Sequence, residues 1–318
     1  MEPIPPRYLF VWTGRAFPYF ARLAIESALV ADPGCEVELH LFGARPDGAV
    51  HLAPLARHPR VHLVPVDLDT VFVGLGVDDR RLRAAYERAG GASARSNLIR
   101  YAVLARRGGI YLDTDVLVAR SMADLRRHPA FAGQEQVLSI DADRVEGRWS
   151  AAMAVPGVAW AAAWGLRRLD ASLGHPGLER LARPLDRYWQ ITQLNNAVIG
   201  AAPGASFVTR LLARAVEVDP RVRYRLGPTL ISEVVAASQH DVTVLPPAAF
   251  YAVPPSYSFQ FFTGGARPLD PAVRVLHVVA SNHGRDLAAL DPATVAARAG
   301  RGSYYALAAQ VAARGEAA

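Results

Sequence analysis

The stretch from Ser93 to Val118 constrains the fold more than any other part of this 318-residue chain. Apolar residues from Leu98 to Ala105 recur with the spacing of one helix face, and the glycine pair at 108–109 predicts the end of that helix. The next residues, Ile110 to Leu112, are β-prone and uninterrupted, as expected for a strand buried on both faces. We therefore predict a helix that doubles back against a buried strand.

The lengths of this helix and strand predict which polar residues meet. Arg100 lies about 10 Å before the end of the helix at about 1.5 Å per residue, and Asp113 lies roughly 13 Å beyond Gly109 at about 3.3 Å per residue. Arg100, with Asn97 one turn before it, should therefore lie beside the Asp-Thr-Asp triplet, at a carboxyl strand end where α/β sheets hold ligands. If the strand continues from Asp113 through Asp115, the two carboxylates point to the same side.

Two carboxylates so close repel each other, and a divalent cation shared with a phosphate relieves that repulsion. Carboxylate and phosphate oxygens are hard ligands that suit Mg²⁺ or Mn²⁺. The stretch therefore predicts a metal-diphosphate site. A bare Asp-Thr-Asp triplet is equally compatible with a polar strand end that leads into a turn, but the helix, glycine pair and apolar strand before it favour the metal site.

The same stretch resembles the signature of DXD-containing retaining glycosyltransferases of glycosyltransferase family 32, the capsular-polysaccharide and outer-chain mannosyltransferase type. More distantly it is similar to the glucosyltransferase domains of clostridial toxins. The residues that carry the resemblance are Ser96, Asn97 and Arg100, followed by the run from Gly108 to Asp115. The family usually has Asp where this chain has Asn97.

The resemblance implies a GT-A-like α/β fold, with a Rossmann-type, mostly parallel sheet flanked by helices and with helical additions. Residues 1–120 would form a nucleotide-sugar-binding half that ends in the DXD strand. Residues 121–318 would form the acceptor-side half and the C-terminal helices of the same domain. The residues themselves favour this class, because apolar runs at 8–12, 37–42 and 61–66 alternate with helical patterns, as in βαβ units.

The resemblance also implies roles for the residues of the site. Asp115 would bind the cation, Mn²⁺ or Mg²⁺, directly, and Asp113 would contact the ribose or a metal-bound water. Arg100 and Asn97 would hold the donor. His277, which ends a predicted strand, would complete the metal shell, and His283 is its rival.

Three further residues are candidates for contacts with the substrates. Trp12 ends the first predicted strand, where the family has an aromatic residue near the nucleotide base, and its flat face suits stacking; the alternative is that it only fills the core. Asn195 and Asn196 precede an apolar strand, and the resemblance implies that they face the donor sugar or the acceptor. Their alternative role is to cap that strand.

Charge and composition exclude several classes of function. The net charge is +6, and every basic residue is Arg. These arginines are scattered without zinc-finger spacing, so we expect no nucleic-acid partner, whereas a basic cleft would attract an anionic nucleotide-sugar. The chain has no apolar run long enough to span a membrane and no signal-peptide pattern at its start. A single cysteine, Cys35, suits a reducing cytoplasmic location.

The sequence therefore predicts a metal-dependent retaining glycosyltransferase. The donor would be a UDP- or GDP-sugar, and the acceptor a hydroxyl of a glycan or a small molecule, as in polysaccharide biosynthesis. Two alternatives stay open. One is a toxin-like transferase that modifies protein side chains, and the other is a catalytically weak nucleotide-sugar-binding protein, which Asn97 suggests.

Overall fold

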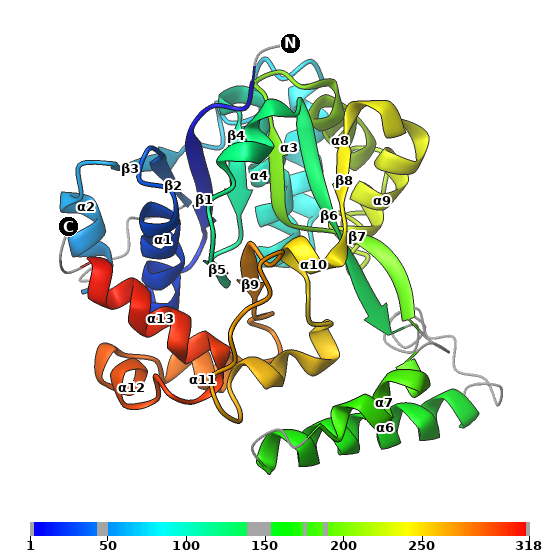
Figure 1. Ribbon diagram of the computed structural model, residues 1–318. Coiled ribbons are helices and arrows are strands. Elements are labelled where there is room, and N and C mark those ends of the chain that lie inside the picture. The colour runs from blue at the N-terminus through cyan, green and yellow to red at the C-terminus, as the bar shows by residue number, and fades with distance from the viewer. Residues whose placement is uncertain (1–2, 43–49, 139–153, 174–176, 187–189, 316–318) are drawn as a thin grey trace.

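The computed structural model describes residues 3–42, 50–138, 154–173, 177–186 and 190–315. Its centre is a seven-stranded sheet with the strand order β3-β2-β1-β4-β7-β6-β8 (Figure 1). The strands of this sheet are β1 (Arg7–Trp12), β2 (Glu36–Phe42), β3 (Val61–Val66), β4 (Gly109–Leu112), β6 (Ala130–Leu138), β7 (Gln190–Ala201) and β8 (Thr243–Leu245). A second sheet pairs β5 (Val116–Val118) with β9 (Val275–His277).

The sheet is mostly parallel. Strands β3, β2, β1 and β4 run parallel to one another, and β6 runs parallel to β8. Only β7 is antiparallel to its neighbours, β4 and β6. The predicted α/β class, with a mostly parallel sheet flanked by helices, is confirmed. The division into two halves at residue 120 stays a prediction.

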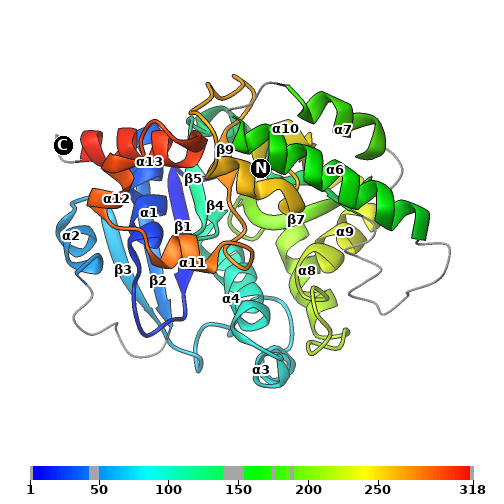
Figure 2. The same ribbon diagram turned by 90° about the horizontal axis from the view of Figure 1, so that it is seen from below.

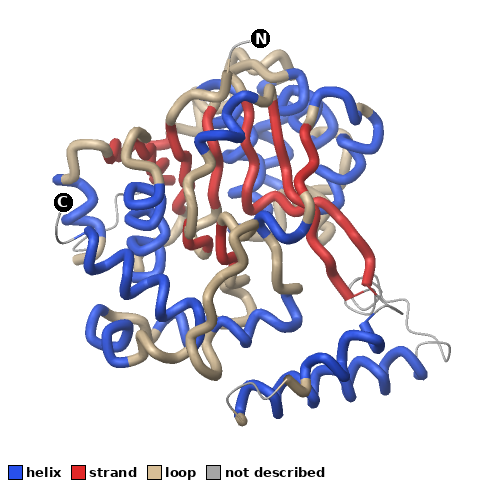
Figure 3. Tube along the Cα trace, viewed as in Figure 1, coloured by secondary structure: helices blue, strands red, loops and turns tan. Residues whose placement is uncertain are grey.

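Helices cover both faces of the sheet, as Figures 2 and 3 show. The α-helices are α1 (Tyr19–Ala31), α2 (Leu52–Arg57), α3 (Asp79–Arg88), α4 (Ala92–Arg107), α6 (Ala154–Ser172), α7 (Glu179–Asp186), α8 (Ser206–Ala215), α9 (Pro228–Ala237), α10 (Pro247–Phe250), α11 (Gly284–Ala288), α12 (Pro292–Ala297) and α13 (Gly302–Gly315). Short 3₁₀ helices are η1 (Ala123–Arg127), η3 (Gln239–Asp241) and η4 (Pro255–Phe261). Among the described residues, no helix has both the length and the apolar character needed to span a bilayer.

The alternation of side chains along β1 explains the two cores. Leu9 and Val11 belong to the core under α4, α8 and α9, whereas Tyr8 and Phe10 belong to the core under α1. Because successive strand residues point to opposite faces, one apolar run fills both layers. Both faces of the β1–β4 region are therefore buried, and polar chemistry is concentrated at the strand ends.

The structure corrects one detail of the aspartate triplet. Strand β4 ends at Leu112, and Asp113, Thr114 and Asp115 form a turn that leads into β5. The strand does not continue through the triplet, so the period-two argument for the two carboxylates does not apply. The turn forms because Val116 donates a backbone hydrogen bond to the carbonyl of Asp113 at 3.2 Å.

Candidate active site

A tight reversal between α4 and β4 sets the geometry of the site. Gly108 has φ +58° and Gly109 has φ +131°, and a Cβ on Gly108 would lie 2.4 Å from Cδ of Pro203. Only glycine tolerates both this backbone conformation and this close approach. The helix therefore turns back directly against the strand, and Arg100 returns to the level of Asp113, as the two lengths predict.

Arg100 is almost completely buried, with 4% of its surface exposed. Its guanidinium donates from Nη2 to Oδ1 of Asp113 at 2.6 Å and from Nη1 to the carbonyl of Asn196. Tyr111 donates from its hydroxyl to the same Oδ1 at 2.7 Å, and the guanidinium lies 4.4 Å from the centroid of the Tyr111 ring. Both bonds to Asp113 end on Oδ1, so the carboxylate is oriented from one side.

The environment of Asp113 acts on its ionisation in opposite directions. Burial raises the pKa of Asp113, the charge of Arg100 opposes that rise, and the neighbouring carboxylate of Asp115 adds to it. A cationic or hydrogen-bonding ligand at this turn would relieve the repulsion between the two carboxylates.

Strand β9 brings a histidine to Asp115. Because β5 and β9 pair with Val116 opposite His277, Nε2 of His277 lies 3.8 Å from Oδ1 of Asp115. The other oxygen of Asp115, Oδ2, accepts a hydrogen bond from the backbone amide of Ala280 at 2.7 Å. The structure thus places His277, and not its rival, beside the aspartate turn.

His283 has a different set of contacts. Its Nε2 lies 2.8 Å from Oγ of Ser258, and its Nδ1 lies 3.5 Å from a carboxylate oxygen of Asp286. Its ring contacts that of Phe262 at a tilt, with the centroids 4.7 Å apart. Burial lowers the pKa of His283. These contacts link η4 to the start of α11, which is a structural role.

Glu135 is a site residue that sequence reasoning missed. It lies on β6 with 2% of its surface exposed, and its Oε1 is 4.0 Å from Nδ1 of His277. Its Oε2 accepts a hydrogen bond from Nδ2 of Asn195 at 2.7 Å. Burial raises the pKa of Glu135, and His277 opposes that rise. In the sequence, Glu135 stands between two glutamines, a pattern typical of a solvent-exposed strand face.

The two asparagines of β7 point to opposite sides of the sheet, as adjacent strand residues do. Asn195 bonds to Glu135, whereas Asn196 donates from Nδ2 to Oδ1 of Asn97 at 2.9 Å and to the Tyr101 hydroxyl at 3.3 Å. Gly227 packs over this pair, because a Cβ there would lie 3.3 Å from Nδ2 of Asn97. Asn97 is 7% exposed and Asn196 is 6% exposed.

Trp12 ends β1, at the same edge of the sheet as the end of β4. Its indole Nε1 donates to the carbonyl of Ala16 at 3.1 Å, and its ring meets Phe17 edge-on with the centroids 5.4 Å apart. The side chain is half-buried. The indole therefore packs against the segment between β1 and α1, and contact with a nucleotide base stays a prediction.

The residues near the turn fit a cation that also binds phosphate. Among the described residues, no three His, Cys, Asp or Glu side chains are arranged to hold a metal ion by themselves. Asp115 and His277 offer an oxygen and a nitrogen 3.8 Å apart. Adjacent ligands about 2.1 Å from one octahedral cation lie about 3.0 Å apart, so this pair would close by less than about 1 Å to hold the ion. Mg²⁺ typically takes one or two carboxylates, with substrate phosphates and waters as its remaining ligands.

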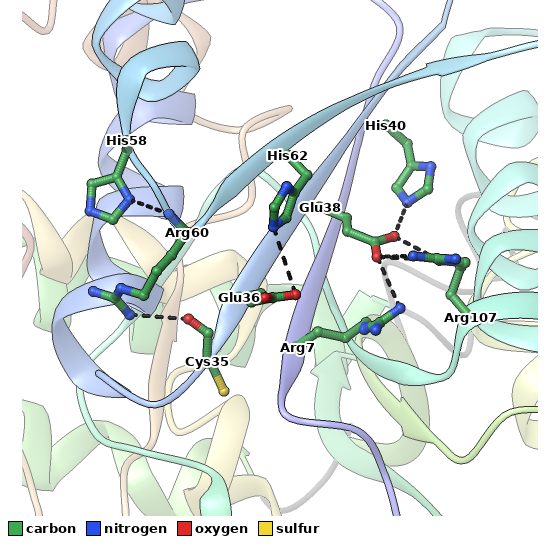
Figure 4. Close-up of polar contacts among 9 residues, drawn as sticks. All are labelled: Arg7, Cys35, Glu36, Glu38, His40, His58, Arg60, His62 and Arg107. Atoms are coloured by element: carbon green, nitrogen blue, oxygen red, sulfur yellow. Dashed lines mark hydrogen bonds and ion pairs between the residues drawn. The ribbon is translucent and has the colours of Figure 1, made fainter.

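A second ionic cluster fixes the far end of α4 to the sheet. Figure 4 shows Glu38 of β2 between Arg7 and Arg107, with His40 beside it. Burial opposes the ionisation of Glu38, but the hydrogen bonds from His40 and Arg107 and the charge of Arg7 outweigh it and lower the pKa of Glu38 to about 2. This cluster holds the last turn of α4, and with it the reversal that positions Arg100.

Comparison with known proteins finds a match at this part of the chain. Residues 64–132 match the family model described as the glycosyltransferase sugar-binding region containing the DXD motif. No curated protein sequence matches the chain. The matched segment runs from the end of β3 to β6 and contains α4, the glycine pair and the aspartate turn.

Several solved structures are similar to part of this chain in their backbone structure. The PaToxG glycosyltransferase is 14% identical, with a TM-score of 0.48 over 74% of this chain and 70% of that one. The UDP-bound glycosyltransferase domain of the YGT toxin is 10% identical, with a TM-score of 0.44 over 77% and 80%. An active-site mutant of LgtC is 16% identical, with a TM-score of 0.42 over 85% and 86%.

The sequence match covers the helix, the reversal and the turn that bring Arg100, Asp113 and Asp115 together. Residues 64–132, which contain the α4–β4 unit, therefore match the DXD-containing sugar-binding region of glycosyltransferases, and glycosyltransferase is the enzyme class that this match supports.

Proposed function

We propose that this protein transfers a sugar from a nucleoside diphosphate sugar to a hydroxyl acceptor, with retention at the anomeric carbon and with Mn²⁺ or Mg²⁺. One observation carries the proposal: Nε2 of His277 faces Oδ1 of Asp115 at 3.8 Å, next to an aspartate that a buried arginine orients. Such a donor pair suits a cation whose other ligands are phosphate oxygens and water.

The bound cation would stabilise the negative charge that develops on the departing nucleoside diphosphate, a contribution of several kcal/mol. The protein's own part is to hold that site in place. Asp115 is fixed through the amide of Ala280, and Asp113 through Arg100 and Tyr111. The free side of Asp113 would meet the ribose or a water on the cation.

Glu135 would hold His277 at its second ring nitrogen, Nδ1, while Nε2 faces Asp115. A histidine that binds a metal commonly donates its other ring nitrogen to a carboxylate, which fixes the ring and its tautomer. Glu135 lies on the Nδ1 side of His277, and Asn195 holds its other oxygen. Because Glu135 is buried and already engaged, it is a positioning residue and not a nucleophile. Retention would then come from attack on the same face as the leaving group, assisted by the departing phosphate.

The resemblance to glycosyltransferase family 32 favours a UDP- or GDP-sugar donor and a glycan or small-molecule acceptor, in a cytoplasmic pathway of polysaccharide biosynthesis. A protein side chain as acceptor is the alternative within the same chemistry. UDP is the first nucleotide to test, because the YGT toxin domain binds it.

The test measures release of nucleoside diphosphate from a panel of UDP- and GDP-sugars, with Mn²⁺ and after dialysis against EDTA. We expect release only with the cation, and Asp115→Asn should abolish it while keeping the Ala280 hydrogen bond and the melting temperature. Asp69→Asn is the matched control, because that carboxylate is 79% exposed. Full activity in EDTA would refute the metal. If the protein binds nucleotides but releases nucleoside diphosphate from none of the donors, it is a nucleotide-sugar-binding protein and not a transferase.

Asn97 bears on which donor sugar the site accepts. Its Oδ1 is bonded to Asn196, so the side chain presents an amide, and not a carboxylate, one turn before Arg100. An aspartate accepts hydrogen bonds from two sugar hydroxyls, whereas an asparagine has one acceptor and gains a donor. We infer that Asn97 selects a donor other than the common hexoses, such as a deoxygenated or amino sugar.

This inference has its own test. Asn97→Asp should raise the use of ordinary nucleotide-hexoses relative to the natural donor, on the order of tenfold to a hundredfold for one hydrogen bond. Asn282→Asp, on an exposed loop, is the control. An unchanged ranking across the donor panel would show that position 97 does not select the sugar.

A further inference from the structure

The hairpin formed by α6 and α7 (residues 154–173 and 177–186) stands at the margin of the molecule, and its helix α6 contacts η4 (Figures 1 and 2). Its inner side is fastened to η4. Arg167 of α6 forms a buried ion pair with Asp186 of α7 and lies 3.9 Å from the centroid of the Tyr257 ring, whose hydroxyl donates to Asp186 at 2.8 Å. These contacts fix which face of the hairpin points outward.

That outward face is apolar. Of the eleven large apolar side chains that are exposed in the described part of the chain, five belong to this hairpin: Val158, Trp164, Leu169, Leu173 and Leu181. Trp164 meets Phe259 of η4 edge-on and lies toward the inner side, so the outward face has the other four. Val158, Leu169 and Leu173 are 71%, 49% and 62% exposed. The exposed small residues Ala161, Ala162 and Gly165 lie between them at helical spacing. The result is a continuous apolar stripe along a 19-residue helix, about 28 Å long.

The charges of the hairpin are sorted by side. Its exposed charged residues are all arginines: Arg168, Arg180 and Arg183. Arg168 lies over the Phe259 ring of η4 at 4.4 Å, at the border with the inner side. The acidic residues of the hairpin face inward. Asp186 is paired with Arg167, and both Asp170 and Glu179 are paired with Arg267 at 3.7 Å and 3.2 Å. The outer surface is therefore apolar and positive, with its negative charges neutralised on the inner side.

The positive character continues beside the stripe. A cavity of about 740 Å³ opens next to Leu169, and its lining includes Arg168, Phe262, Thr263 and Arg301. The described lining contains two arginines and no carboxylate. An anionic group that approaches the stripe would meet arginines on both sides of it.

We propose that the outer face of the α6–α7 hairpin docks on an anionic lipid surface. An amphipathic helix with an apolar face and flanking arginines lies in the plane of such a surface, with its apolar side chains below the headgroups. A second copy of this chain suits the face less well, because a two-fold contact would bring together two sets of arginines with no exposed carboxylate of the hairpin to pair them. The proposal does not depend on the transfer reaction, because these contacts and charges lie outside the aspartate turn.

The test is flotation of the full chain with phosphatidylcholine vesicles that do or do not contain phosphatidylglycerol. We expect binding only to the anionic vesicles, and weaker binding at high salt. Val158→Asp with Leu173→Asp should reduce partitioning about tenfold or more, because both changes place charges in the apolar layer. Arg180→Ala with Arg183→Ala should reduce it by a similar factor.

Matched controls keep the result interpretable. Val73→Asp and Val222→Asp change valines that are 49% and 54% exposed outside the hairpin, and they should leave partitioning unchanged. Because every substituted position is exposed, the melting temperature should not move. The proposal is overturned if wild-type protein does not float, or if the aspartate variants of the hairpin float as wild type does. Self-association that Val158→Asp abolishes, without vesicle binding, would assign the face to a second copy.

Discussion

The most demanding prediction concerns Glu135, because it separates a positioning role from a merely structural one. Glu135→Gln keeps the size of the side chain and one acceptor for Asn195. It replaces the carboxylate that lies 4.0 Å from Nδ1 of His277 with a neutral amide. An amide nitrogen can donate toward Nδ1, which favours the histidine tautomer with its proton on Nε2. Nε2 of His277 would then present a hydrogen to Asp115 in place of a lone pair.

The expected magnitude follows from the position of Glu135 behind the histidine. Loss of such an outer carboxylate typically costs about 10- to 100-fold in metal affinity. Stability should not fall, because removing the charge of a residue that is 2% exposed also removes the cost of burying it. We therefore expect Glu135→Gln to weaken binding of Mn²⁺ in the presence of UDP, measured by titration calorimetry without turnover, at an unchanged or higher melting temperature.

Glu38→Gln is the matched control for this measurement. Glu38 is another buried glutamate of the sheet, but its partners are Arg7, His40 and Arg107. Its substitution removes the charge partner of the partly exposed Arg7 and Arg107, so it should lower stability and, because it touches neither Asp115 nor His277, leave the Mn²⁺ affinity unchanged. If Glu135→Gln binds Mn²⁺ as tightly as the wild type, or if both variants lose affinity only in proportion to lost stability, the positioning role is wrong.

Three further predictions use other parts of the same framework. His277→Ala should reduce turnover while His283→Ala lowers only the melting temperature; the reverse result in a kinetic assay would assign the metal to His283. Gly108→Ala should lower the free energy of unfolding in urea by about 2 kcal/mol or more, because it places a Cβ 2.4 Å from Pro203 at φ +58°; an unchanged midpoint would contradict this. Glu38 has a pKa of about 2 against an ordinary 4.5, so its contribution of about 3 kcal/mol is complete above pH 4.5 and is lost as the pH falls toward 2. The free energies of unfolding of the wild type and of Glu38→Gln, measured against pH, should converge as the pH approaches 2.

The part of the site that the sequence predicts is the part that local geometry encodes. Only a helix, a glycine pair and a short strand separate Arg100 from Asp113, so known rises per residue suffice to place them together. The turn at Asp113–Asp115 was less predictable, because a strand and a turn accommodate this triplet equally well. The hydrogen bond from the amide of Val116 to Asp113 decides between them.

The remaining site residues arrive through pairings between distant segments, which no local pattern specifies. His277 meets Asp115 because β9 pairs with β5 in a register that sets His277 opposite Val116. The pairing of β6 with β7 jumps from Ala132 opposite Ile199 to Gly133 opposite Asn195, so β7 residues 196–198 are skipped. Regular pairing would set Glu135 opposite Asn196, whereas the jump sets it opposite Gln193, on the same face as Asn195, whose Nδ2 donates to it. The hydrogen bond from Asn195 to Glu135 thus depends on an irregularity in the sheet, and restoring regular pairing there should separate the asparagine from the carboxylate that it holds.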